Sequence, residues 1–260
     1  MFAYTYENMM EDIKILKESY PEVPVFSIGQ SLDSRELIAI KLGNGSKRIF
    51  LNGAHHGMEW LTAKVLIDFA KEVAQKKTAA CSLYIVPMVN PDGVEIASKG
   101  EKWQANRRGV DLNHNYNALW ELSKQLEISH GVTAPGPTRY GGEYPESEPE
   151  TKAIANFTRQ NNFDMAIALH SQGEVIYYDF CGIVPDGTQE YLTAFESVSR
   201  YRRDNPEGIA SYGGYKDWFI KKFKKPAFTI EIGLGENPLP LSDLENVYNQ
   251  VAPILRTAIQ

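Results

Sequence analysis

Residues 48–60, RIFLNGAHHGMEW, join a short apolar run to a group of candidate metal ligands. The run at 49–53 predicts a buried strand, and the apolar spacing in 59–73 predicts a helix directly after it. Either His55 or His56 could act together with Glu59, because both spacings bring the two side chains to one face of a helical turn. Zinc is bound by imidazole nitrogen and carboxylate oxygen, so this stretch predicts half of a metal site at the end of a strand.

The composition limits the classes of protein to which the chain can belong. With 260 residues and 43% hydrophobic content, the chain can bury a sizeable core. We see no linker and therefore expect a single domain over residues 1–260. The net charge of −6 argues against a nucleic-acid or anionic-membrane surface. No apolar run approaches the ~20 residues of a bilayer span, and the N-terminus lacks a secretory pattern. We expect a cytoplasmic protein, or a secreted or spore-associated one if the sequence is a fragment, and its oligomeric state is open.

Strands and helices alternate along most of the sequence. Predicted strands lie in 23–42 (two, around 29–33), 49–53, 83–88, 164–169, 175–180 and 227–232, and predicted helices in 9–20, 59–73, 189–202, 215–222 and 241–258. This alternation predicts an α/β fold with a mixed, largely parallel twisted sheet and helices on both faces.

The segments between these elements contain turn and helix-start signals. Residues 90–93, Asn-Pro-Asp-Gly, predict a turn, and residues 100–144 predict a long functional loop. Residues 147–150, Ser-Glu-Pro-Glu, predict a helix start with Ser147 as the cap.

Two residues downstream complete a possible hydrolytic centre. His170 ends the apolar strand 165–169, and Glu231 ends the apolar strand 227–230. Ligands of open α/β sheets bind at the carboxyl ends of strands. His170 and the His-Glu motif both lie at such ends, and together they favour a metal site. A hydrolytic zinc also needs a proton acceptor, and a carboxylate at the end of an apolar strand is the natural candidate.

With these motifs in order, the sequence resembles the zinc carboxypeptidase family. The matching segments are HGMEW at 56–60, GVDLNHN at 109–115, LHS at 169–171 and TIEI at 229–232. The resemblance implies a zinc metallopeptidase with one Zn²⁺ per chain, held by His56, Glu59 and His170. It further implies that Asp111 orients a ligand imidazole and that Glu231 activates water and protonates the leaving amine.

The sequence departs from the family pattern around the substrate. Asn113 matches a family residue that grips the substrate carboxylate, but His114 replaces the neighbouring arginine, and an imidazole does not reproduce a bidentate guanidinium. Gln104 aligns with the arginine that stabilises the oxyanion. We assign that role to Arg108, with Arg107 as the alternative.

Segments 58–60, 169–174 and 213–220 look most like the bacterial γ-D-glutamyl–diaminopimelate peptidases. The resemblance places Lys216 in the specificity pocket, where a cation would select a charged or zwitterionic leaving residue. The predicted substrate is therefore a peptide derived from peptidoglycan. The alternatives are a carboxypeptidase on ordinary peptides, a zinc deacylase or amidase of the same fold, and an inactive module that binds cell-wall peptides.

Overall fold

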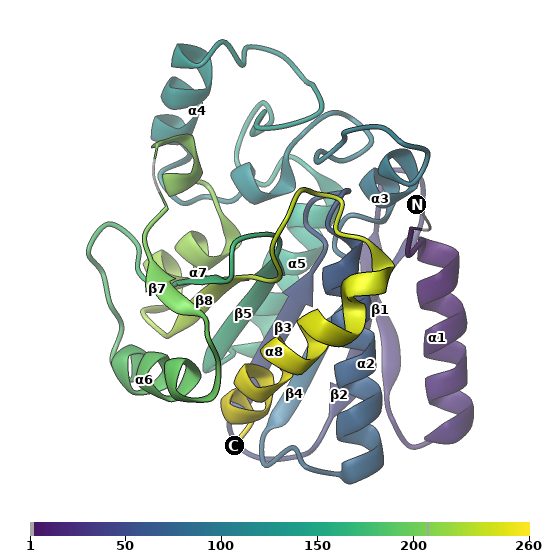
Figure 1. Ribbon diagram of the computed structural model, residues 1–260. Coiled ribbons are helices and arrows are strands. Elements are labelled where there is room, and N and C mark those ends of the chain that lie inside the picture. Colours follow the sequence, from purple (N-terminus) through teal and green to yellow (C-terminus); the bar gives the residue numbers. More distant parts are fainter. Residues whose placement is uncertain (1–2, 207) are drawn as a thin grey trace.

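The computed structural model describes residues 3–206 and 208–260, which form helices around one eight-stranded sheet (Figure 1). The strands are β1 (Val25–Gln30), β2 (Glu36–Leu42), β3 (Arg48–Gly53), β4 (Ser82–Val86), β5 (Met165–His170), β6 (Val175–Tyr177), β7 (Arg202–Asp204) and β8 (Ala227–Glu231). The helices are α1 (Tyr6–Ser19), α2 (Trp60–Lys76), α3 (Pro91–Ala97), α4 (Trp120–Ser129), α5 (Pro149–Asn161), α6 (Thr188–Val198), α7 (Tyr215–Phe223) and α8 (Leu244–Ala258). Short 3₁₀ turns are η1 (Leu112–His114), η2 (Gly208–Ser211) and η3 (Leu241–Asp243).

The sheet has the order β1-β2-β4-β3-β5-β8-β6-β7. Its centre, β4-β3-β5-β8, is parallel, whereas β1, β2 and β6 join by antiparallel pairing. The mixed, largely parallel α/β sheet predicted from the sequence is therefore confirmed.

Two apolar clusters cover the two faces of this sheet. Figure 1 shows α2 and α8 on the near face and α5 and α7 on the far face. In β3, Ile49 and Leu51 face the first cluster, and Phe50 faces the second, where its ring stacks on Phe163 with centroids 4.8 Å apart. Each such fully buried side chain contributes about 1.5–3 kcal/mol relative to exposure. Burial on both faces fixes the register of β3 and hence the position of the loop that follows it.

The structure corrects three local predictions in the connecting segments. Residues 90–93 form the start of α3 rather than a free turn, because the Asn90 side chain accepts a hydrogen bond from Gly93 N and Pro91 occupies the first turn. The predicted loop 100–144 contains η1 and α4. The N-cap residue of α5 is Glu148, one residue later than predicted, and its side chain makes no capping hydrogen bond. The Ser147 hydroxyl donates to Glu148 Oε1 and does not cap the helix.

A fourth prediction is wrong near the far edge of the sheet. The helix predicted for 189–202 ends at Val198, and Arg202–Asp204 forms strand β7 beside β6. Among the residues that the structure describes, no helix is long and apolar enough to cross a membrane.

Candidate metal centre

Three parallel strands deliver their last residues to one edge of the sheet. Gly53 at the end of β3 lies opposite Leu169 of β5, and His170 at the end of β5 lies opposite Glu231 at the end of β8. The loop after β3 and the ends of β5 and β8 therefore meet at the carboxyl edge, as the sequence predicts.

The loop between β3 and α2 is a hydrogen-bonded turn that contains His56 and Glu59. Glu59 N donates to His56 O at 3.0 Å, and Glu59 is the N-cap of α2, so the helix itself begins at Trp60. The Thr62 hydroxyl accepts from Ala54 N at 2.7 Å and donates to Glu59 O at 2.7 Å. These contacts fix the loop at both ends. His56 and Glu59 therefore lie on a turn that precedes α2, and not on the first turn of the helix as the sequence suggested.

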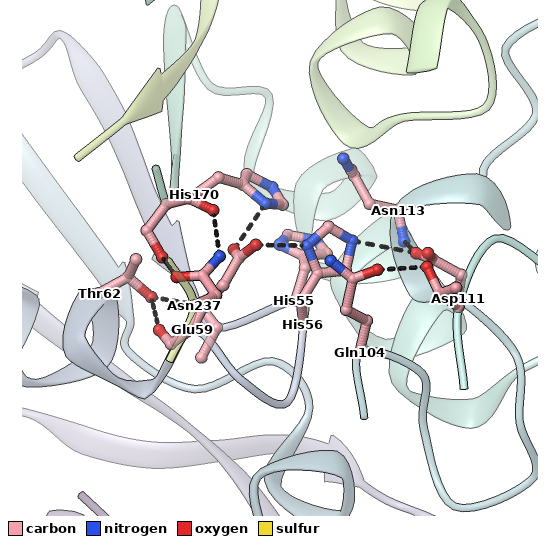
Figure 2. A network of polar contacts seen from close by, with 12 residues as sticks. His55, His56, Glu59, Thr62, Gln104, Asp111, Asn113, His170 and Asn237 are labelled. Carbon is pink, nitrogen blue, oxygen red and sulfur yellow. Dashed lines mark hydrogen bonds and ion pairs between the residues drawn. The ribbon is translucent and has the colours of Figure 1, made fainter. Parts of the chain in front are cut away.

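His56, Glu59 and His170, the metal cluster, place three donor groups around one point (Figure 2). The Glu59 carboxylate faces His56 Nδ1 at 2.8 Å and His170 Nδ1 at 3.0 Å. One ligand atom from each residue lies within 4.8 Å of the others. Two imidazole nitrogens and one carboxylate are the donor set of a catalytic zinc with an open position.

The surroundings of the metal cluster also fit a cation. His56 Nε2 is 3.1 Å from Asp111 Oδ1, which leaves Nδ1 of the same ring facing Glu59. Glu59 and Asp111 are both buried, and within the described residues no lysine or arginine side chain forms an ion pair with either. Because buried carboxylates need compensating positive charge, a divalent ion held by these residues would balance the site.

The two candidate histidines of the loop have different partners. His55 is fully buried, and its Nε2 lies 3.0 Å from the Tyr116 hydroxyl. Its ring stacks on that of His170 with centroids 5.4 Å apart. The geometry therefore favours His56 as the ligand and gives His55 a packing role behind His170.

The charges of the site shift the pKa values of its members. Burial opposes ionisation of Glu59, but the facing rings of His56 and His170 lower the pKa of Glu59 to about 2. Burial also opposes ionisation of Asp111, yet His56 and His114 hold the pKa of Asp111 well below its usual range. Burial disfavours the charged form of His56, but Glu59 and Asp111 raise the pKa of His56 well above its ordinary value. A proton and a metal ion therefore compete for this position.

Glu231, the predicted base, is half-buried at the end of β8. Desolvation, and then the negative charge of Glu59, raises the pKa of Glu231 to about 8. No lysine or arginine among the described residues forms an ion pair with its carboxylate. Such a group, next to the metal cluster and without a fixed counter-ion, can accept and return a proton.

The three predicted substrate-binding residues lie on η1 and α7. Asn113 Oδ1 accepts a hydrogen bond from Tyr215 N at 3.0 Å, which places the start of α7 against η1. His114 is buried with Nδ1 3.4 Å from the Ser123 hydroxyl and 4.0 Å from Glu127 Oε1. Lys216 is buried as well, with Nζ 2.6 Å from Asp217 Oδ1 and in contact with Asp179 O. Lys216 is thus part of an ion pair with Asp217, and its place in a specificity pocket stays a prediction.

Neither arginine proposed for the oxyanion contacts the metal cluster among the described interactions. Arg108 is 55% exposed and pairs with the buried Glu148 at 3.3 Å, and Arg107 is 56% exposed, 3.8 Å from Asp33. The oxyanion role of Arg108 stays a prediction without support from this geometry.

Sequence reasoning also missed Asn90, which joins the loops around the site. Its side-chain nitrogen donates to His55 O at 3.0 Å, Gln104 O at 3.1 Å and Ala105 O at 3.0 Å. The available signal was the Asn-Pro-Asp-Gly segment, which predicted a turn and gave no partner for the asparagine.

Comparison with known proteins identifies the family of this site. The zinc carboxypeptidase family model matches residues 9–253, and the chain belongs to this family. It is a zinc metallopeptidase.

Individual relatives agree with the family assignment. The chain is 36% identical to γ-D-glutamyl-L-diamino acid endopeptidase 1 of Lysinibacillus sphaericus, over 96% of this chain and 71% of that protein. It is 32% identical to the uncharacterized protein YqgT of Bacillus subtilis, over 96% of this chain and 75% of that protein. Bovine thrombin-activatable fibrinolysis inhibitor, solved with tick carboxypeptidase inhibitor, shares the fold with a TM-score of 0.81 at 23% identity, over 98% and 95% of the two chains.

Proposed function

We propose that this peptidase hydrolyses the γ-D-glutamyl–diaminopimelate amide bond of peptides derived from bacterial peptidoglycan. The observation that supports this substrate is the 36% identity, over nearly the whole chain, to a protein named as a γ-D-glutamyl-L-diamino acid endopeptidase. The acidic net charge of −6 disfavours a polyanionic partner such as a nucleic acid.

The residues of the site can perform the hydrolysis in a simple order. When bound by His56, Glu59 and His170, zinc supplies a Lewis acid that acidifies a water molecule and polarises the scissile carbonyl. Asp111 keeps the His56 ring in the tautomer whose Nδ1 faces the other ligands. Glu231 accepts one proton from the attacking water as its oxygen bonds to the carbonyl carbon. Glu231 then returns that proton to the amide nitrogen as the C–N bond breaks.

The groups on α7 and η1 are consistent with a zwitterionic leaving residue. Diaminopimelate has a second carboxylate and a second amine at its distal end. The buried Lys216–Asp217 pair offers one charge of each sign at the start of α7, next to Tyr215, whose N–H is bonded to Asn113. A pair of opposite charges complements a zwitterion better than a neutral or singly charged side chain.

An ordinary carboxypeptidase function has weaker support. It requires a strong grip on the terminal carboxylate, usually a bidentate arginine. Here the position after Asn113 is an imidazole that faces Ser123 and Glu127 of α4. A deacylase or amidase of the same fold would share the metal chemistry and differ only in the acyl side of the substrate.

The substrate is tested by incubating the zinc-loaded enzyme with L-Ala-γ-D-Glu-diaminopimelate and matched peptides. The panel includes the lysine analogue, the α-linked D-glutamyl isomer, ordinary C-terminal peptides and N-acyl amino acids. Mass spectrometry of the products should show L-Ala-D-Glu and free diaminopimelate from the first peptide. Cleavage of ordinary C-terminal residues or N-acyl groups with the γ-linked peptide intact would contradict the proposal.

The role of Lys216 has its own prediction. Lys216→Ala should lower kcat/KM for the diaminopimelate peptide more than for the lysine analogue. Only the diaminopimelate peptide has a distal carboxylate that can contact Lys216. We expect a difference of about tenfold, equivalent to about 1.4 kcal/mol. Lys222→Ala, on the same helix, is the matched control. Equal losses on both peptides would reject the assignment.

A further inference from the structure

We propose that the side-chain amide of Gln104 donates a hydrogen bond to the carbonyl oxygen of the scissile amide as negative charge develops on it. Addition of water to an amide carbonyl moves the π electrons onto this oxygen, and preorganised donors lower the energy of that state. The proposal rests on the peptidase function above but not on the identity of the substrate.

The backbone of Gln104 is tied to the loop that contains His56. Gly57 N donates to Gln104 O at 2.9 Å, and the Asn90 side chain donates to both Gln104 O and His55 O. A Cβ atom on Gly57 would lie 2.7 Å from Trp103 O, so only glycine permits this approach of the two loops. These bonds hold the backbone of Gln104 beside the loop that contains His56 (Figure 2).

The side chain of Gln104 is oriented by the segment on its other side. Gln104 N donates to Pro137 O at 2.8 Å, and the Thr138 hydroxyl donates to the Gln104 side-chain oxygen. The next residue, Arg139, donates its backbone N–H to Asp111 Oδ2 at 2.9 Å. A single short segment therefore aligns both Gln104 and the carboxylate that orients His56.

The amide nitrogen of Gln104 is the remaining donor. In Figure 2 the Gln104 oxygen points toward the Asp111 side, and the nitrogen points toward the side of His56 and Glu59. Among the described contacts this nitrogen has no acceptor in the protein, although the residue is half-buried. A half-buried amide that faces a hydrolytic centre with its N–H groups free is suited to a developing oxyanion.

Other donors near the site have competing partners or another position. Arg108 pairs with Glu148, and both it and Arg107 are more than half exposed. The Asn113 amide nitrogen also lacks an acceptor in the described part of the chain, but the Asn113 oxygen accepts from Tyr215 N at the start of α7, where the leaving residue is proposed to bind. The two amides should accordingly differ in effect: Asn113 on KM and Gln104 on kcat.

The kinetic test compares Gln104→Met, of similar volume without a donor, with Gln104→Glu, of the same shape with acceptors only. The assay uses the peptide that the unmodified enzyme cuts fastest in the panel, so a wrong substrate assignment leaves this test intact. Loss of one oxyanion donor should lower kcat by about 10²–10³-fold, with KM changed less than about threefold. Zinc content should stay at the wild-type value, and Lys102→Ala, an exposed change in the same segment, should leave kcat unchanged.

A binding measurement separates this role from a structural one. Calorimetry on the zinc-loaded protein compares a phosphinic pseudopeptide, which has a tetrahedral anionic centre, with the free diamino acid product. In Gln104→Met the affinity for the phosphinic compound should fall in parallel with kcat, and the affinity for the product should not change. Equal losses for both ligands, or a kcat within about threefold of wild type, would overturn the proposal. A kcat loss in Arg108→Ala or Arg139→Ala without one in Gln104→Met would also overturn it.

Discussion

At the residue scale, the site joins carboxylates and imidazoles that have no lysine or arginine partner within residues 3–206 and 208–260. Glu59 bridges the two imidazoles of the metal cluster, and Asp111 holds the far nitrogen of His56. This arrangement accumulates negative charge in a buried place, which is stable only when protons or a metal ion compensate it. Desolvation, with the negative charge of Glu59 as the second cause, raises the pKa of Glu231, which therefore has a basicity suited to exchange of a proton with water.

Replacement of Glu231 tests its assignment as the base. Glu231→Gln keeps the size of the side chain but removes the proton acceptor, so turnover should fall by at least about 10²-fold while zinc content is retained. Steady-state kinetics and elemental analysis on one preparation provide both readings. Glu236→Gln, an exposed change in the following loop, is the control. Near-normal turnover in Glu231→Gln would remove it from this role.

The sequence pattern brought the candidate metal ligands together, whereas it gave no partner for the arginine assigned to the oxyanion. His56, Glu59 and His170 converge because strands of one parallel sheet end at one edge, a rule that sequence patterning can use. Arg108 was assigned by proximity in sequence. Its long flexible side chain instead pairs with Glu148, the N-cap residue of α5, and such a long-range partner leaves no local signal.

At the element scale, a mixed polar and charged contact joins helices α2 and α8 in addition to their apolar packing. Arg256 donates two hydrogen bonds to the Glu72 carboxylate, each at 2.7 Å, and the Tyr248 hydroxyl donates a third at 2.7 Å. These bonds lower the pKa of Glu72 to about 2. Because α2 begins directly after Glu59, this contact helps to fix the helix that supports a metal ligand.

The depressed pKa of Glu72 predicts the pH dependence of this contact. The ionised carboxylate is favoured in the folded protein, so its stabilisation is complete above the unfolded pKa of about 4.5 and declines as the pH falls toward 2. Arg256→Met should lower the free energy of unfolding by about 1 kcal/mol at pH 7, since the pair is partly solvated. The difference should shrink below about pH 4.5 in urea denaturation. A difference that stays constant from pH 7 down to about pH 2.5 would contradict this account.

Long periodic elements were predicted well, and short ones were not. Helices α1, α2, α7 and α8 follow apolar spacing that their burial requires. Strand β7 has three exposed residues, Arg202–Asp204, and forms only because β6 is available as a neighbour. Asn90 and Pro91 favour turns and helix starts equally, and the contact of Asn90 with residues 55, 104 and 105 selects the helix.

At the scale of the whole molecule, the metal centre links elements that are distant in sequence. His56 follows β3, His170 ends β5 and Glu231 ends β8. A ligand that binds the folded chain and not the unfolded chain stabilises the fold by mass action. Bound zinc should therefore strengthen the connection between the two halves of the sheet.

Removal of the metal should lower both activity and thermal stability. Free zinc at about 1,000 times its dissociation constant adds about 4 kcal/mol, which raises Tm by on the order of 10 °C for a chain of this size. Scanning calorimetry before and after chelation, and again after zinc is returned, measures the change, with Mg²⁺ as the control ion. Full activity and an unchanged Tm in the metal-free protein would contradict a zinc mechanism.

The most direct test of the zinc centre is anomalous X-ray diffraction from crystals of the zinc-loaded protein, with data on both sides of the zinc absorption edge. The account predicts one strong zinc peak per chain, about 2.0–2.2 Å from His56 Nδ1, His170 Nδ1 and a Glu59 carboxylate oxygen. A zinc peak bound by other residues, or no peak at His56, Glu59 and His170 in fully active protein, would contradict it.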